Sequence, residues 1–390
     1  MTVVDARAQT AAPATTAAPA AAPATVPQLP RRVGKVTAPR RDRRKASETE
    51  TGWSKPLLWR VAAMIVVLIA FLTPRLIELD RMVTPDEPIW LARSANFYEA
   101  LSSGDLGSTY QFAHPGVTVM WLGAAGYWWK ARDYASQVDG QISQRLNRVA
   151  RYLEEFGYAP LDVLVAGRIM LVLAMALVFA AAFLYALRLM TFSVAVLGFL
   201  LIALDPFALA LSRLLHVDAM SAMMMLLCVL SGTVYLVRGR KRGDLLLSGI
   251  AAGLAVLTRS QMGILAVWFP LMLLIDARGW RLGGGNWIAS LRSCVRPLAI
   301  WGSAAFITCV VLWPALWVDP LRVIEGMLDF AGTAAIEGHE RTIVFAGELH
   351  AGDPGVRFYP ATFLWRATPS VLIGITLAIV ALVWARRWQV

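Results

Sequence analysis

Apolar residues gather along the chain in runs that approach the length of a membrane crossing. Eight such runs occupy residues 57–72, 163–187, 192–204, 217–237, 245–257, 262–275, 298–312 and 371–384. A helix needs about 20 apolar residues to cross the hydrocarbon core of a bilayer, and several of these runs are near or somewhat below that length. The pattern predicts an all-α polytopic membrane protein, a transmembrane helix bundle with about eight membrane segments.

Two neighbouring runs, 245–257 and 262–275, leave an alternative open. Each is shorter than the roughly 17 residues that a span usually requires. They form either two short spans or one re-entrant hairpin. Both arrangements return the chain to the same side of the membrane, so the predicted topology of the other segments is unaffected.

The composition agrees with a membrane protein, since 57% of the residues are hydrophobic, 16% are charged and the mean hydropathy is +0.57. A net charge of +11 is compatible with nucleic-acid binding, but the basic residues do not follow one polar face. They cluster in every second connection between apolar runs, within 40–45, 188, 238–242, 278–296 and 386–387. This alternation predicts a cytoplasmic N-terminus, and we expect no nucleic-acid partner.

Residues 1–52 differ in character from the rest of the chain. They are rich in Ala, Pro and Thr, then basic, and contain no apolar stretch that could form a core. We expect a disordered cytoplasmic tail, followed by one membrane domain over residues 53–390. The first apolar run begins late and no small-residue cleavage site follows it, so it is predicted to remain as an anchor.

The topology places two long connections, 73–162 and 313–366, on the outer side. The first contains Asp86 and Glu87 between two prolines, then a predicted amphipathic helix over 88–101, and tryptophans that indicate helices at the headgroup level. Adjacent helical residues point about 100° apart, so we expect one carboxylate to act as a base and the other to support it. The alternative is a helix N-terminus whose acids suit the helix dipole.

Charged residues at the rims of the apolar runs form a second candidate constellation. Arg168, Arg213 and Arg259 fall near the outer ends of different predicted helices, together with His216 and Asp218. Guanidinium groups match phosphate oxygens, so three of them at one level favour an anion site. Alternatively, each arginine snorkels to the interface by itself. A base beside such arginines suits group transfer from a lipid phosphate.

The second outer connection carries histidines and carboxylates within 337–353, including His339, and then Tyr359. Their spacing matches no strong metal motif, so we expect loop hydrogen bonds or substrate contacts there and no metal. A metal held by histidine and carboxylate is the alternative.

From about Trp53 onward, the sequence resembles the GT-C glycosyltransferases that use polyprenyl-phosphate sugars, specifically the protein O-mannosyltransferase and aminoarabinose transferase branch. The motifs that carry the resemblance are, in chain order, Asp86-Glu87, His114-Pro115, Ser212-Arg213 with Asp218, the segment 249–259, and Tyr359-Pro360 with Thr368-Pro369. Gly116 departs from the family by replacing a proline, and Arg259 stands where a lysine is common. The chain also ends soon after an apolar run, where family members continue, which leaves a minimal enzyme, a fragment or a degenerate copy open.

The resemblance implies an inverting enzyme that moves a hexose or pentose from a polyprenyl-phosphate donor to a protein, lipid or glycan acceptor on the outer face of the membrane. Asp86 would be the general base, and Glu87 would orient it or bind the acceptor. The expected ligands of the donor phosphate are Arg168, Arg213 and Arg259, and the expected substrate contacts are His114, His216, Asp218, His339 and Tyr359. We expect a monomer or homodimer that needs no cofactor besides its donor. The alternatives are a non-catalytic subunit that binds lipid-linked sugar, and a transporter or flippase.

Overall fold

The computed structural model describes residues 51–144, 148–278, 287–336 and 342–387, and most of these residues are helical. The expected N-terminal tail falls outside the described residues except for positions 51 and 52. A short 3-10 helix, η1 (Gly52–Ser54), begins there, and the Gly52 amide donates a hydrogen bond to the Met190 carbonyl at 2.8 Å. This bond fixes the start of the described chain against the residue that follows helix α6.

Every predicted apolar run is helical, and all but the start of the run 262–275 lies in an α-helix. The helices concerned are α1 (Leu57–Leu76), α6 (Pro160–Leu189), α7 (Phe192–Leu204), α9 (Val217–Val237), α10 (Arg242–Thr258), α11 (Leu265–Arg278), α12 (Trp287–Leu312) and α16 (Pro369–Arg387). Within the described residues, five helical segments are long and apolar enough to cross a membrane: Leu57–Leu76, Pro160–Leu189, Val217–Val237, Ser260–Ala277 and Ile288–Leu312. A sixth crossing results if α15 (Phe358–Arg366) and Pro369–Trp384, which meet at 113°, form one bent span. The chain is therefore a polytopic helical membrane protein.

The two ambiguous runs form separate helices. Helix α10 has 17 residues, which corresponds to a length of about 25 Å. The 3-10 helix η3 (Ser260–Ile264) then leads into α11. Ser260–Ala277 has the length and composition of a span, whereas α10, which packs along α9 and α12, is not among the five qualifying segments. The choice between two short spans and a re-entrant pair therefore stays open.

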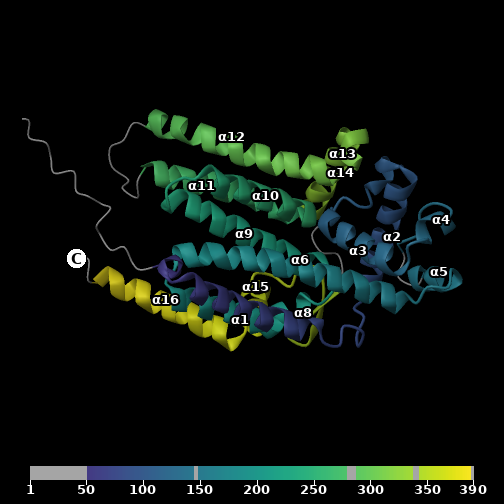
Figure 1. Cartoon of the computed structure of the whole chain (residues 1–390), viewed down its shortest axis with the longest axis horizontal. Coiled ribbons are helices and arrows are strands. Elements are labelled where there is room, and N and C mark those ends of the chain that lie inside the picture. Colours follow the sequence, from purple (N-terminus) through teal and green to yellow (C-terminus); the bar gives the residue numbers. More distant parts are fainter. Residues whose placement is uncertain (1–50, 145–147, 279–286, 337–341, 388–390) are drawn as a thin grey trace, which may run out of the picture. The chain divides into compact units, whose positions relative to one another are not determined.

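Helices α6, α9, α10 and α12 pack in that order, each against the next, as Figure 1 shows. The contact between α10 and α12 depends on two small residues. A Cβ atom at Gly249 would lie 2.5 Å from the carbonyl oxygen of Trp301 in α12. A Cβ atom at Gly253 would lie equally close to the carbonyl oxygen of Ala305. This glycine pair is therefore used for close packing inside the chain.

The first long connection folds into a helical layer at one end of these helices. Its elements are α2 (Glu87–Ser103), η2 (Leu106–Thr109), α3 (Val117–Lys130), α4 (Tyr134–Gln137) and α5 (Val149–Glu155). The predicted helix over 88–101 is confirmed as α2. Trp90, however, is buried instead of lying at the membrane surface, because α3, α4, α5 and η2 all pack around α2. Trp128 and Trp129 are exposed, as expected of interfacial residues.

The remaining elements lie between the apolar helices or in the second long connection. They are α8 (Pro206–Leu211), α13 (Ala315–Val318), α14 (Pro320–Ile336), β1 (Thr342–Phe345) and β2 (Glu348–Ala351). The two strands pair antiparallel, with Thr342 opposite Ala351. Helix α14 reaches the first connection, because Phe330 packs edge-on against Phe112 with ring centroids 5.5 Å apart. The two long connections therefore meet at the end of the helices where Asp86 lies.

Candidate active site

The adjacent carboxylates Asp86 and Glu87 lie at the N-terminus of α2 and have opposite environments. Asp86 is the N-cap residue, and its side chain is 69% exposed. Glu87 is the first residue of the helix and is fully buried. The turn between two prolines, together with the helical rotation of about 100° per residue, separates the two side chains. The expected division between one reactive and one supporting carboxylate therefore has a geometric basis.

Glu87 is held by Arg168 of α6. The guanidinium donates from Nε and Nη2 to the two carboxylate oxygens at 2.7 and 2.5 Å. The Thr84 amide and hydroxyl and the Leu215 amide donate three further hydrogen bonds to the same carboxylate, at 2.9, 3.0 and 2.9 Å. Burial alone would raise the pKa of Glu87, but the bonds from Arg168 and the two amides outweigh it and hold the pKa below its ordinary value.

Arg168 is only 2% exposed, and all three of its side-chain nitrogens have partners. Besides Glu87, it donates to the Leu79 carbonyl and, at 2.6 Å, to the Met82 carbonyl. Arg168 thus fixes the segment before α2, and these bonds use four of its five N–H groups. A donor phosphate, the ligand that the sequence assigned to it, would compete with these partners. Of the two roles expected for Glu87, its burial favours orienting Asp86 over contacting the acceptor.

Asp86 faces His216, the N-cap residue of α9, with 3.7 Å between Oδ2 and Nε2. The other ring nitrogen, Nδ1, accepts a hydrogen bond from the Asp218 amide at 3.4 Å. This bond selects the tautomer that carries its hydrogen on Nε2, toward Asp86. The ring edge also packs against Trp90 of α2, at a centroid distance of 6.0 Å.

Asp218 in turn forms an ion pair with Arg259, which lies just after α10. The Arg259 side chain is 35% exposed, and its Nε donates to Gln261 at 3.1 Å. Unlike Arg168, Arg259 is therefore accessible to a ligand. It would have to share its positive charge between Asp218 and an incoming phosphate.

His114 completes the group. Its Nδ1 lies 3.2 Å from the Ser260 hydroxyl, and its ring packs against Phe330 of α14 at 6.0 Å. Burial, then the positive charges of Arg259 and Arg93, lower the pKa of His114 to about 4. At neutral pH the ring is therefore uncharged and serves as a hydrogen-bonding group.

Arg93, on α2, is a member of this neighbourhood that sequence reasoning missed. Its guanidinium lies over the rings of Trp90 and Phe112, at 4.7 and 4.4 Å, and its Nε donates to Gln144 at 2.9 Å. Burial lowers the pKa of Arg93 to about 10, so it keeps its positive charge at neutral pH. We use the name polar cluster for the set Asp86, Arg93, His114, His216, Asp218 and Arg259.

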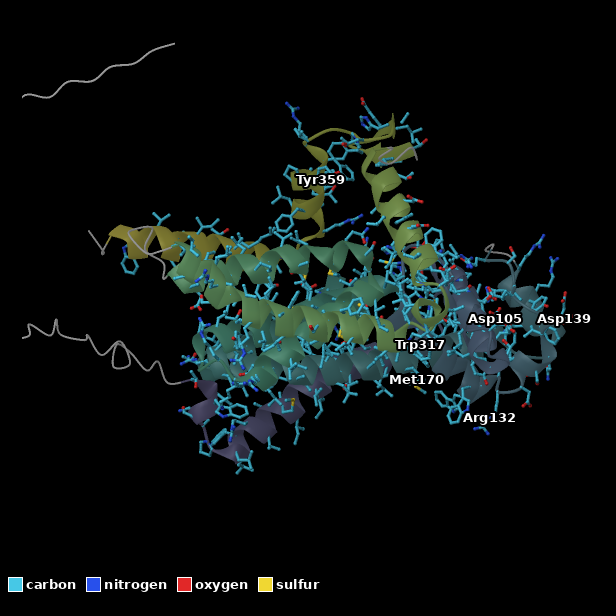
Figure 2. All side chains as sticks on the ribbon, turned by 90° about the horizontal axis from the view of Figure 1, so that it is seen from above. Asp105, Arg132, Asp139, Met170, Trp317 and Tyr359 are labelled. Atoms are coloured by element: carbon cyan, nitrogen blue, oxygen red, sulfur yellow. The ribbon has the colours of Figure 1, made fainter. Side chains whose placement is uncertain are left out.

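The other predicted site residues lie apart from the polar cluster. Arg213 donates to the carbonyls of Ile77 and Glu78 and lines a separate hollow of about 210 Å³ together with Arg81 and Arg168. Tyr359 lies on α15 and is 67% exposed; Figure 2 labels it on that helix. His339 lies outside the described residues.

Comparison with known protein families gives a match over the helices that carry His216, Asp218 and Arg259. Residues 160–301, which contain α6 to α11 and much of α12, match the family model of dolichyl-phosphate-mannose-protein mannosyltransferases. This match, over about a third of the chain, supports a membrane glycosyltransferase of the GT-C type. No curated protein and no solved structure matches it.

The matched segment supplies part of the polar cluster. His216, Asp218 and Arg259 lie within it, whereas Asp86, Arg93 and His114 precede it. Among the described residues, no three His, Cys, Asp or Glu side chains are grouped so that they could hold a metal ion. The cluster consists of the exposed carboxylate of Asp86, two histidines, Arg93 and the half-buried Asp218–Arg259 ion pair.

The glycine at position 116, where the family resemblance leads one to expect proline, has a structural reason. Gly116 is the N-cap residue of α3 and has a φ of +59°, which proline cannot adopt. A Cβ atom there would also collide with the ring of Trp90. The glycine lets the segment after His114 turn tightly beneath Trp90, which contacts both His216 and Arg93.

We expect Gly116→Ala to lower the free energy of unfolding by about 2–4 kcal/mol, because it adds overpacking to the cost of a left-handed residue. Thermal unfolding in detergent, followed by tryptophan fluorescence, would measure the loss. Gly104→Ala is the matched control, since Gly104 has a φ of +80° but open space around it. Equal losses in the two variants would show that the Trp90 contact does not matter.

Proposed function

We propose that this protein transfers a hexosyl or pentosyl group from a polyprenyl-phosphate donor to an acceptor hydroxyl or amine, with inversion at the anomeric carbon. The observation that carries the proposal is the exposed Asp86 carboxylate beside His216, in one cluster with the accessible Arg259. A base and a phosphate-binding cation placed this close suit an acceptor on one side of the sugar and a leaving phosphate on the other.

In the proposed reaction, Asp86 removes the proton of the acceptor as its oxygen or nitrogen forms a bond to the anomeric carbon. The bond from that carbon to the phosphate oxygen breaks, and the phosphate keeps the electron pair. Because attack and departure occur on opposite faces, the configuration inverts. A phosphate is a good leaving group, so the step requires no general acid.

His216 is the proposed positioning residue for Asp86. Its Nε2 hydrogen points toward the carboxylate, and the Asp218 amide fixes the ring from the other side. The buried Glu87–Arg168 ion pair fixes the turn that carries Asp86. His114, neutral at physiological pH, is the proposed hydrogen-bonding contact to substrate.

Of the three arginines that the sequence assigned to the donor phosphate, we propose Arg259 for this role. Arg93 adds a second positive charge to the same neighbourhood, although its aromatic contacts restrict it to a supporting electrostatic role. Arg213 and Arg81 could receive another part of the lipid carrier in their hollow. The alternation of basic connections further supports a cluster on the outer face of the membrane and a cytoplasmic N-terminus.

The test is turnover of a panel of polyprenyl-phosphate sugars by the purified protein. We expect release of free polyprenyl phosphate, with acceptor products of inverted anomeric configuration by NMR. Donor binding detected by native mass spectrometry, without release from any donor, would instead support a non-catalytic binding subunit. Movement of intact donor across a vesicle membrane would support a flippase.

A further inference from the structure

A second hollow lined by arginines lies at the other end of the helices that carry the polar cluster. Helix α9 (Val217–Val237) begins directly after His216, and Tyr235 lies in its last turn. Its 21 residues separate the two ends of the helix by about 30 Å. The hollow measures about 160 Å³ and is lined by Tyr235, Arg240, Arg242, Leu245, Arg296, Pro297 and Ile300. These residues come from α9, α10, α12 and the turn between α9 and α10, so three separate parts of the chain contribute an arginine.

The turn between α9 and α10 holds Arg240 in an unusual conformation. Arg240 has a φ of +54°, a left-handed conformation that costs about 1–2 kcal/mol for a residue with a Cβ atom. Its amide donates to the Tyr235 carbonyl at 3.1 Å, and its guanidinium lies 5.9 Å from the Tyr235 ring centroid. Arg240 also pairs with Asp276 of α11. The turn is thereby fixed at the wall of the hollow.

The other two arginines carry charges that no described residue pairs. Among the described residues, neither Arg242 nor Arg296 has a hydrogen-bond or ion-pair partner, and both are exposed. Asp276 neutralises only Arg240, so the hollow has an excess of positive charge. Unpaired guanidinium groups that converge on one hollow can bind an anion bidentately, and phosphate oxygens match their geometry.

The apolar part of the lining distinguishes between sources of phosphate. Leu245, Pro297 and Ile300 form the side of the hollow that continues into the apolar helices α10 and α12. A volume of about 160 Å³ is below the roughly 300 Å³ typical of pockets for drug-sized ligands. Basic pockets between membrane helices bind the head groups of anionic lipids. The acyl chains of such a lipid would lie along the apolar side.

We propose that this hollow binds the phosphate of an anionic phospholipid head group. The site is separate from the polar cluster and does not depend on the function proposed for it. The lipid would fix α12 against the turn between α9 and α10, at the end of the bundle opposite the polar cluster.

The test uses native mass spectrometry of the full chain in detergent with added phosphatidylglycerol. The double variant Arg242→Gln/Arg296→Gln removes the two unpaired charges, and each is expected to contribute about a factor of five to binding at such a surface. We expect about 25-fold weaker binding. The control is Arg238→Gln/Arg292→Gln, which removes two exposed positive charges from the same region but leaves the lining intact. It should retain near wild-type binding.

Three results would overturn the proposal. An equal loss of phosphatidylglycerol binding in the two double variants would mean that the lipid binds a diffuse positive surface and not a defined site. Equal binding of phosphatidylcholine would exclude selection for an anionic head group. Displacement of phosphatidylglycerol by millimolar inorganic phosphate would assign the hollow to a soluble anion. If the double variant is not monodisperse, the single variant Arg242→Gln, at the exposed first residue of α10, should still lower binding about fivefold.

Discussion

Replacing Asp86 by Asn is expected to reduce sugar transfer by about 10²–10⁴-fold, the range attributed to a general base. Asparagine keeps the size of the side chain and its place beside His216 but cannot accept the acceptor proton. The measurement is the rate of polyprenyl phosphate release at saturating donor. Since Arg259 is unchanged, donor affinity should stay within a few fold of wild type, so the effect should fall on turnover.

The matched control for that variant is Asp105→Asn. Asp105 is an exposed carboxylate of the same connection, labelled in Figure 2, and it lies outside the polar cluster. Its turnover should equal that of wild type. Near-normal release by Asp86→Asn would remove Asp86 from the role of base. A loss of donor binding together with turnover would point to a binding role for the carboxylate instead.

The apolar pattern predicted the helices well because burial in a bilayer depends on composition over many residues. It predicted their ends less well. Helix α12 starts at Trp287, whereas the run begins at 298, because Arg292 and Arg296 interrupt the apolar pattern without interrupting the helix. Long arginine side chains let a helix continue out of the apolar region toward water. Hydropathy alone therefore underestimates such segments.

The candidate site could be predicted as a set of residue types but not as a set of partners. The rotation between adjacent helical residues indicated that Asp86 and Glu87 would differ, and they do. Nothing in the sequence indicated that Glu87 would pair with Arg168, 81 residues later. The role of phosphate ligand, which the sequence suggested for this arginine, stays a prediction. Arg93 was missed because an arginine in an amphipathic pattern resembles a solvent-facing residue, and only the packing of α3 and the loop at Phe112 buries it.

The Glu87–Arg168 pair leads to the second large expected effect. Glu87→Gln should lower the free energy of unfolding by about 3–5 kcal/mol at pH 7, because it leaves the Arg168 charge buried without its counter-ion. The loss can be measured by denaturant or thermal unfolding of the detergent-solubilised protein. Glu78→Gln is the control, since the Glu78–Arg81 pair is exposed and such pairs contribute about 0–1 kcal/mol.

The dependence of this loss on pH separates the ion pair from simple packing. The folded-state pKa of Glu87 lies below its ordinary value of 4.5, so the unfolded chain binds the proton first as the pH falls. The stability that the charged carboxylate provides is therefore complete above about pH 4.5 and is lost as the pH falls through the folded-state pKa. The difference between wild type and Glu87→Gln should shrink over that range. Replacing Arg168 by Met in the Glu87→Gln background should recover part of the lost stability, because it removes the unpaired charge. A difference that is constant with pH, and no recovery in the double variant, would mean that Glu87 stabilises the turn before α2 by its shape and neutral hydrogen bonds alone.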